Sequence, residues 1–380
     1  MSVVEQNKEW IESIWSKIEK KAKRVAVKSR DKIPYTTVNG EHDNKAVTSP
    51  AWWTNGFWGG MMWLLYNATK DEDYKITAER CELLLDEALK NYKSLHHDVG
   101  FMWHITSGAN YRLTGNEASY NKNLYIAATL FSRYNPDGGY IRAWNSEPAA
   151  NYSIIDCLLN IPLLYWASEE IGDDRFKRIA MNHCDMALRD HIREDGSTNH
   201  IVDHDHLTGE CVRVLGGQGY AADSCWSRGL AWAVYGTILS YVHTGKKEYL
   251  EAAKKTANYF ISNVALYDYL PPSDFKAPLE PVYYDSTAGV CTACGLIEIA
   301  KYVSEAESEM YLDAAIKILK AAEEHFCDFS EEEDSILQKG TVSYPLREEM
   351  MANVHIPLIY GDFFLVEAIC KLRGDDFLIW

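Results

Sequence analysis

The sequence predicts an all-α protein, folded as a closed (α/α)6 barrel of six helical hairpins. Amphipathic patterns with apolar spacings of three and four residues recur from one end of the chain to the other. Five helix-to-helix junctions share a short polar turn followed by an aromatic residue, and clearly alternating strands are scarce. The junctions are ATKDEDY, LTGNEASY, IGDDRF, TGKKEYL and SEAESEMYL, with the aromatics Tyr74, Tyr120, Phe176, Tyr249 and Tyr311.

The apolar periodicity places about twelve helices, and no linker divides them, so residues 1–380 are predicted to form one catalytic domain. Each junction closes an apolar helix and opens an amphipathic one, as a tight turn between an inner and an outer helix should. An open stack of helical repeats would also give hairpins, but its repeat would be shorter and more regular. The predicted helices span 6–28, 56–69, 72–92, 100–114, 117–133, 153–171, 173–191, 224–244, 246–265, 285–303, 307–326 and 360–373, with short extended pieces near 139–145, 198–215 and 339–346.

The connections opposite the tight turns are longer, and they collect the unusual residues of the chain. Loops are free to build a binding site on a rigid scaffold, so we expect the site at this end of the barrel. These connections are 43–56, 93–103, 134–153, 193–226, 266–285 and 337–359.

Composition excludes several classes of partner and site. The formal net charge of −17, without a basic run, argues against nucleic acid or an anionic membrane. The polar start and the lack of a long apolar stretch, with nine scattered cysteines, predict a soluble cytoplasmic protein with reduced thiols. Cys291 and Cys294 have C-x-x-C spacing inside an apolar helical run, which favours helix packing over a redox or zinc site. No cofactor is indicated, and the oligomeric state is expected to be monomer or homodimer.

Asp98 lies in SLHHDVGFMW, at a predicted loop-to-helix junction beside His96 and His97. A helix cap would explain an aspartate at this point. Two adjacent histidines and the aromatic residues Phe101 and Trp103 favour a functional carboxylate instead, because such surroundings can shift its pKa.

Asp156 lies in NYSIIDCLLNIPLLYWAS, which is otherwise an apolar helical pattern. A buried charge is costly unless it is paired or protonated. The alternative is a structural aspartate satisfied by backbone groups near a helix start. The functional interpretation is a carboxyl with a raised pKa, able to donate a proton near neutral pH.

A third concentration of polar and aromatic residues is LGGQGYAADSCWSRGLAW, with Gln218, Trp226, Arg228 and Trp232. Its glycines permit an unusual backbone path close to a ligand, although the lysine and the preceding strand of a phosphate-binding loop are missing. Aromatic residues on other loops, which suit stacking on sugar rings, include Trp52, Trp53, Trp58 and Trp144, and His200 follows in GSTNHIVDHD.

The run Asp203, His204, Asp205 and His206 allows a metal hypothesis, because two histidines two residues apart on an extended piece can share an ion. Nothing in the sequence identifies further ligands. A solvated hairpin tip is the favoured interpretation.

Five motifs, taken together and in order, resemble the unsaturated glucuronyl hydrolases of glycoside hydrolase family 88. They are WTNGFWGG, LHHDVGF, SIIDCLLN, GQG followed by WSRGLAW, and DSTAGVCTACGL. The resemblance covers nearly the whole chain and implies a six-hairpin helical barrel. The related unsaturated rhamnogalacturonyl hydrolases are similar, but the HHD motif favours the glucuronyl group.

The resemblance implies hydration of a double bond rather than direct attack on a glycosidic bond. The substrate would be a lyase-generated oligosaccharide, such as a glycosaminoglycan disaccharide, with an unsaturated uronic acid at its non-reducing end. A proton goes to C4 and water to C5 of this vinyl ether, and the hemiketal opens to release the aglycone sugar.

Carried over position by position, the resemblance makes Asp156 the general acid and base and Asp98 its essential partner. Arg228 is the residue expected to face the substrate carboxylate. The residues that would line the sugar site are Trp53, His97, Trp144, His200, Gln218, Trp226, Arg228 and Trp232.

The chain also departs from the family pattern. Gly217 stands where some relatives have histidine, and Tyr360 where some have tryptophan. The stretch 341–360 matches poorly, which leaves its role in aglycone and sulfate recognition open, with Ser343 and Arg347 as weak candidates. Two alternatives stay open, a conventional glycosidase on the same barrel and a non-catalytic sugar-binding protein.

Overall fold

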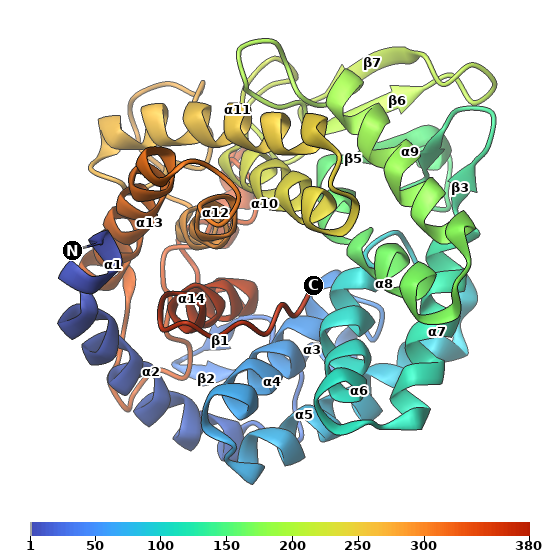
Figure 1. Cartoon of the computed structure of the whole chain (residues 1–380). Coiled ribbons are helices and arrows are strands. Elements are labelled where there is room, and N and C mark those ends of the chain that lie inside the picture. Colours follow the sequence, from blue (N-terminus) through green and yellow to red (C-terminus); the bar gives the residue numbers. More distant parts are fainter. Residues whose placement is uncertain (1) are drawn as a thin grey trace.

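The computed structural model describes residues 2–380, and its long helices form two concentric rings (Figure 1). The inner ring consists of α4 (Phe57–Thr69), the π-helix η4 (Gly100–Gly108) continued by α6 (Ala109–Thr114), α8 (Pro162–Ile171), α10 (Ser227–Thr244), α12 (Ser286–Ile299) and α14 (Ile359–Leu372). The outer ring consists of α5 (Glu72–Leu85), α7 (Glu117–Phe131), α9 (Asp174–Asp190), α11 (Lys247–Val264), α13 (Glu305–Phe326) and α2 (Lys8–Lys28). This arrangement confirms the predicted six-hairpin helical barrel.

The sixth inner–outer pair is formed by the two ends of the chain. Five inner helices are followed directly by their outer partners, but α14 packs against α2, which comes first in the sequence. The barrel is therefore closed by contacts between residues more than 300 positions apart, such as Arg373 with Glu12.

The junctions noted in the sequence are the tight turns at one end of the barrel. In four of them the residue that ends the inner helix is left-handed, and three of these four residues are glycines, which adopt this conformation without strain. Tyr74 and Tyr249 then pack inward in the first turn of the outer helix, and Tyr311 of the fifth junction is buried one turn later in α13.

The inner helices are buried on all sides, because they face both the barrel axis and the outer ring. Every residue of α12 is buried, including Cys291 and Cys294, and the Cys294 thiol donates to the Phe364 carbonyl at 3.3 Å. The C-x-x-C pair thus packs between helices, as predicted, and burial raises the pKa of both thiols. Among residues 2–380, no helix has the length and apolar character needed to cross a bilayer.

Two predicted helices are wrong in part. The span 72–92 is an α-helix only to Leu85, and two short 3-10 helices follow, η2 (Asp86–Lys90) and η3 (Tyr92–Ser94). The span 153–171 starts as strand β5 (Tyr152–Ile154) and the 3-10 helix η6 (Ile155–Leu159), and only α8 is α-helical. Residues of β5 pair with a strand nearly 50 positions later, a contact that local periodicity cannot report.

Strands and short helices gather in the longer connections. A three-stranded antiparallel sheet contains β5, β6 (Ile201–His204) and β7 (Cys211–Leu215). Two hairpins pair β1 (Thr37–Val38) with β2 (Glu41–His42) and β3 (Tyr134–Asn135) with β4 (Tyr140–Ile141). The remaining short helices are α1 (Val3–Gln6), α3 (Lys45–Thr48), η1 (Trp53–Gly56), η5 (Ala149–Asn151), η7 (Ala265–Tyr267) and η8 (Glu348–Asn353).

Candidate active site

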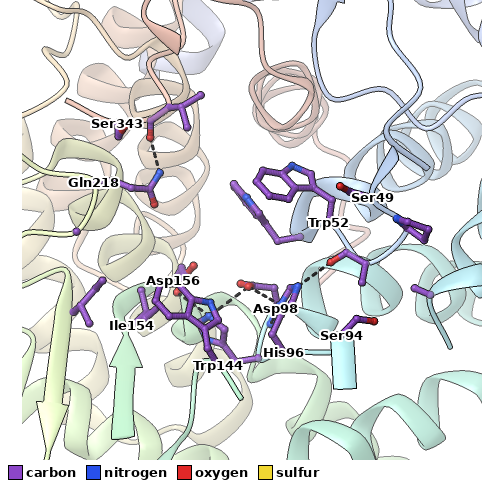
Figure 2. A pocket seen from close by; sticks show the side chains of 18 of the residues that line it. Ser49, Trp52, Ser94, His96, Asp98, Trp144, Ile154, Asp156, Gln218 and Ser343 are labelled. Carbon is purple, nitrogen blue, oxygen red and sulfur yellow. Dashed lines mark hydrogen bonds and ion pairs between the residues drawn. The ribbon is translucent and has the colours of Figure 1, made fainter. Parts of the chain in front are cut away.

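A cavity of about 990 Å³ opens where the longer connections converge (Figure 2). It contains both predicted acids and all the predicted sugar-site residues except Arg228. Connection 266–285 contributes no lining residue among those described, contrary to expectation, whereas the other five do. The predicted residues that line the cavity are Trp53, His97, Asp98, Trp144, Asp156, His200, Gln218, Trp226 and Trp232.

Asp98 is surrounded by hydrogen-bond donors just before the π-helix η4 begins. Its Oδ2 lies 2.9 Å from His96 Nδ1 and 3.3 Å from His97 Nε2, and Asn160 Nδ2 donates to Oδ1 at 3.3 Å. Burial alone would raise the pKa of Asp98, but the interactions with His97 and His96 outweigh it and leave the pKa below its ordinary value. Asp98 is therefore ionised at neutral pH.

A glycine makes the approach of Asn160 to Asp98 sterically feasible. A Cβ atom on Gly100 would lie only 2.6 Å from the Asn160 carbonyl oxygen, so a side chain at this position would push the two segments apart. The Phe101 amide then donates to Asn160 Oδ1 at 2.8 Å, which orients the amide group so that its nitrogen faces Asp98. Asn160 belongs to the motif SIIDCLLN but was not singled out in the sequence.

Asp156 has almost none of these donors. It lies in η6, and its Oδ1 is buried without a hydrogen-bond partner, 3.7 Å from His97 Nε2. Burial, followed by the negative charge of Asp98, raises the pKa of Asp156 well above its ordinary value. The side chain still keeps 19% of its surface exposed, against 7% for Asp98, so a ligand in the cavity can reach it.

His97 lies between the two acids and is neutral. Burial lowers its pKa to about 4, and its Nδ1 is buried without a partner. The proton is best placed on Nε2, where it can be donated to Asp98, because an orphaned donor at Nδ1 would be costly. One atom each from His97, Asp98 and Asp156 lie within 4.8 Å of one another, but a protonated Nε2 has no lone pair for a metal. His97 Nε2 can thus donate to Asp98 Oδ2 at 3.3 Å, whereas Asp156 Oδ1 lies farther from it, at 3.7 Å.

His200 lies between two backbone groups of the glycine-rich loop. Its Nδ1 is 2.9 Å from the Gln218 amide, from which it can accept, and 3.2 Å from the Gly216 carbonyl. Burial lowers the pKa of His200 to about 3. Gly217 is left-handed here, and a Cβ at this position would lie 2.1 Å from His200 Nδ1, so a histidine at 217 would require His200 to move.

Aromatic rings form the floor and rim of the cavity. Trp53 contacts Trp232 edge to face with centroids 6.4 Å apart, and it packs on Tyr360 at 5.0 Å. Trp226 stands beside His200 with centroids 4.3 Å apart, whereas Trp144 remains 40% exposed at the rim. Such rings supply flat apolar surfaces next to the polar acids, as a site for sugar rings needs.

Arg228 is not among the residues that line the cavity, and its expected contact with the substrate carboxylate stays a prediction. It is fully buried behind the cavity, where it pairs with Asp285 and donates to the carbonyls of Thr341 and Val342. Its charge is thus compensated by a residue 57 positions away. Arg228 fixes the segment that places Ser343 in the cavity wall.

Trp52, His96 and Ser343 also line the cavity, although the set of sugar-site residues implied by the resemblance did not include them. Trp52 and His96 lie beside predicted residues, so sequence proximity was a usable signal. Ser343 was named only as a candidate for sulfate contact, and its segment is held at the cavity by Gln218 and Arg228, both of which donate to the Val342 carbonyl.

The acidic and histidine-rich run at 203–206 lies at the β6–β7 hairpin. His206 is exposed in the turn, whereas His204 is buried, stacked on Tyr140 and within 2.8 Å of Ser153 Oγ. The predicted hairpin tip is confirmed, and the two histidines lie in different environments.

No protein-family model matches the chain, but individual relatives do. It is 35% identical over 329 residues to an unsaturated glucuronyl hydrolase of Bacillus sp. (strain GL1). The aligned region covers 84% of this chain and 86% of the relative. It is also 32% identical over 342 residues to an unsaturated chondroitin disaccharide hydrolase of Streptococcus pneumoniae, covering 86% and 83% of the two chains.

Solved structures give the same result. The crystal structure of the unsaturated glucuronyl hydrolase from Bacillus sp. GL1, described as responsible for the degradation of glycosaminoglycan, superposes with a TM-score of 0.86 and 31% identity over 95% of this chain and 97% of that one. A Streptococcus agalactiae unsaturated glucuronyl hydrolase with an aspartate replaced by asparagine, complexed with dGlcA-GalNAc6S, gives a TM-score of 0.81 and 27% identity over 97% and 94%.

The order of the motifs, the double ring of helices and the paired acids in the cavity agree with these similarities over most of the chain. The chain belongs to the unsaturated glucuronyl hydrolase family of glycoside hydrolases.

Proposed function

We propose that the chain hydrates the C4=C5 double bond of an unsaturated uronic acid at the non-reducing end of lyase-generated oligosaccharides. Glycosaminoglycan-type disaccharides are the favoured substrates. The observation that carries the proposal is the opposite pKa shift of two neighbouring carboxyls that both line the cavity, Asp98 lowered and Asp156 raised. In such a pair, the carboxyl with the raised pKa can donate a proton and the carboxyl with the lowered pKa can act as the anion.

Asp156 acts as the proton donor. A vinyl ether is protonated on carbon, which requires an acid that is still protonated near neutral pH, and its burial beside Asp98 meets this requirement. The proton goes to C4, and the positive charge that develops at C5 and the ring oxygen is stabilised by the ionised Asp98. The Asp156 carboxylate formed in this step then accepts a proton from the water that adds to C5.

Release of the aglycone follows from the product of hydration. Adding water across the double bond leaves a hydroxyl on C5 next to the ring oxygen, which is a hemiketal. It opens by breaking the bond between C5 and the ring oxygen, which leaves a ketone at C5 and a hemiacetal at C1. The hemiacetal then collapses to an aldehyde and releases the second sugar as an alcohol, so no nucleophile attacks the anomeric carbon.

The segment around Ser343 is our candidate for contact with the aglycone. Gln218 and Arg228 both donate to the Val342 carbonyl, so this wall is preorganised and continuous with the acid-bearing part of the cavity. The relatives named for chondroitin disaccharides support a sulfated or acetylated amino sugar as the second residue.

A conventional glycosidase on the same scaffold is the second candidate. An inverting pair of carboxyls needs a gap of about 6.5–9.5 Å for the attacking water. Here one oxygen of each acid lies within 4.8 Å of the other, with His97 beside them, which favours hydration over inverting hydrolysis.

The proposed activity is tested with a panel of unsaturated disaccharides from chondroitin, hyaluronan, heparin, ulvan and pectin lyases. Hydration removes the double bond, so ultraviolet absorbance falls as the substrate is consumed. No loss of absorbance across the panel would refute the proposal.

Isotope-labelled water separates the two enzymatic candidates. Hydration places the label on C5 of the uronic acid, whereas hydrolysis places it on the anomeric carbon. A labelled anomeric carbon before any label at C5 would establish the glycosidase. Binding of an unsaturated disaccharide by both the wild type and D156N, with turnover by neither, would identify a sugar-binding protein.

We also propose that residues 1–380 act as one catalytic domain in the cytoplasm, as a monomer or homodimer. One hydrophobic core cluster extends from Ile11 to Trp380, which supports a single folding unit. All nine cysteines are unpaired, as expected in a reducing compartment. Sedimentation of the purified protein would measure the oligomeric state.

A further inference from the structure

His96 has an unusual position among the groups that line the cavity, because each of its ring nitrogens faces an oxygen atom. Nδ1 lies 2.9 Å from Asp98 Oδ2, and Nε2 lies 2.9 Å from the carbonyl oxygen of Ala51 (Figure 2). The Ala51 carbonyl can only accept a hydrogen bond, so Nε2 must carry a proton. The remaining question is which group holds the proton between Nδ1 and Asp98.

Two arrangements satisfy this second contact. In one, His96 is an imidazolium and donates from both nitrogens, and Asp98 is ionised. In the other, neutral His96 accepts from a protonated Asp98. Asp98 also faces His97 Nε2 at 3.3 Å and Asn160 Nδ2 at 3.3 Å, and both contacts favour a carboxylate that accepts. The backbone amide of Asp98 points at His96 Nδ1 from 3.2 Å and favours the neutral ring, but this contact is longer than the 2.9 Å contact between Nδ1 and Asp98 Oδ2. The hydrogen bond to Asp98 raises the pKa of His96 against the effect of burial, which agrees with the imidazolium.

The second contact of His96 reaches a different part of the site. Ala51 lies directly before Trp52 and Trp53, which line the same cavity. Asn55 Nδ2 donates to the carbonyls of Ser49 and Pro50, at 3.0 and 2.8 Å, so the loop is held at its other end as well. Through His96, the ionised acid and the aromatic floor of the cavity share one anchoring side chain.

We propose that His96 is a positioning residue for the hydration reaction, which fixes the Asp98 carboxylate through Nδ1 and the Trp52–Trp53 loop through Nε2. The proposal rests on the proposed function for its catalytic meaning, but the contact itself is independent of any substrate. His97, although adjacent and of the same type, is neutral, and its Nε2 faces the two acids.

The surrounding charges support different roles for His96 and His97. Arg133 is the other cation that acts on both histidines, and it donates to the carbonyls of Leu95 and Ala143. On the η2 side of the cavity, Glu87 and Lys90 are paired with each other at 2.6 Å. Asp156 faces the network through His97, so Asp98 is the carboxylate that contacts His96 directly.

Two substitutions separate the two contacts. In H96Q the longer amide can reach the Ala51 carbonyl but not hold Asp98, whereas in H96N the shorter amide can reach Asp98 but not Ala51. We expect H96Q to lower kcat/KM about tenfold near neutral pH and to move the acidic limb of its pH profile up by about one unit, since Asp98 then binds a proton more readily. For H96N we expect a smaller shift of this limb and a raised KM, because the aromatic loop is released.

The matched control is H206Q, since His206 is exposed in the β6–β7 turn and outside the cavity. Its kinetics should equal those of the wild type. A loss of activity in H96Q that is uniform across pH, or an acidic limb unchanged in both variants, would overturn the proposal and leave His96 a purely structural residue.

Nitrogen NMR of the histidine rings tests the contact without any turnover. We expect His96 to remain an imidazolium above its ordinary titration midpoint near pH 6.5, and D98N to lower that midpoint. A midpoint at or below about 6.5 in the wild type, unchanged in D98N, would refute the proposal. If no unsaturated disaccharide is consumed but the NMR result holds, the proposed function fails while the His96 contact stands.

Discussion

The surroundings of Asp98 and Asp156 differ sharply although the two carboxyls share one cavity. Asp98 receives contacts from His96, His97 and Asn160, whereas Asp156 Oδ1 is buried with no partner. Both groups lose water on folding, so burial acts on both in the same direction. The contacts with His97 and His96 therefore lower the pKa of Asp98, and the negative charge of Asp98 adds to burial in raising the pKa of Asp156.

The largest expected effect comes from removing the proton donor. D156N keeps the shape of the side chain but cannot supply a proton, so we expect kcat to fall by about 10²–10⁴-fold with little change in disaccharide binding. Ultraviolet absorbance assays measure kcat, and calorimetry measures disaccharide binding. Retained turnover of a confirmed substrate in D156N would remove Asp156 from the acid role.

Replacing the anion tests the other side of the comparison. D98N should lower kcat by about 10²–10³-fold, because the positive charge that develops at C5 loses its counter-charge. It should also lower the pKa of Asp156, since burial is then the main remaining cause of the upward shift. The basic limb of the residual activity should move to lower pH, and a limb that stays in place would contradict electrostatic coupling of the two acids.

Removing one donor from Asp98 should make the two surroundings more alike. N160A deletes the hydrogen bond to Oδ1 and should raise the pKa of Asp98, which moves the acidic limb upward and lowers kcat/KM about tenfold near neutral pH. The pH dependence of kcat/KM separates this effect from misfolding, because a misfolded fraction lowers the whole profile equally.

The smallest effect concerns stability. The pKa of Asp156 is higher in the folded than in the unfolded state. The contribution of Asp156 to the free energy of unfolding is therefore complete below the unfolded pKa near 3.9, and it is lost as the pH rises toward the folded pKa. D156N does not titrate, so it should gain about 1 kcal/mol or more over the wild type across this window. Denaturant titrations at pH 4 and pH 8 measure the difference, and an equal difference at both values would contradict the raised pKa.

Much of the barrel could be predicted because its signals are local. A polar turn and an inward aromatic such as Tyr74 repeat within a few residues of each junction, and burial on all sides makes α12 uniformly apolar. The candidate acids were also recognisable, since an aspartate in an apolar segment or beside two histidines is uncommon.

The features that could not be predicted depend on contacts with residues far away in the sequence. Residues 153–159 read as helix because their apolar pattern does not reveal that β5 pairs with β6. The ion pair of Arg228 with Asp285 was not recognisable either, because Asp285 lies at the start of another helix. His96 could not be separated from His97 in the sequence, since their environments differ through distant groups, the Ala51 carbonyl beside His96 and Asp156 beside His97.

Closure of the ring by α2 and α14 has a consequence for how the site is assembled during folding. Trp53 packs on Tyr360, the second residue of α14, so the aromatic floor needs a contact between early and late parts of the chain. Such non-local contacts form slowly, because a long loop must be closed before they stabilise anything. We therefore expect the catalytic cavity to mature in a late folding step, after the four tight-turned hairpins with left-handed caps have formed.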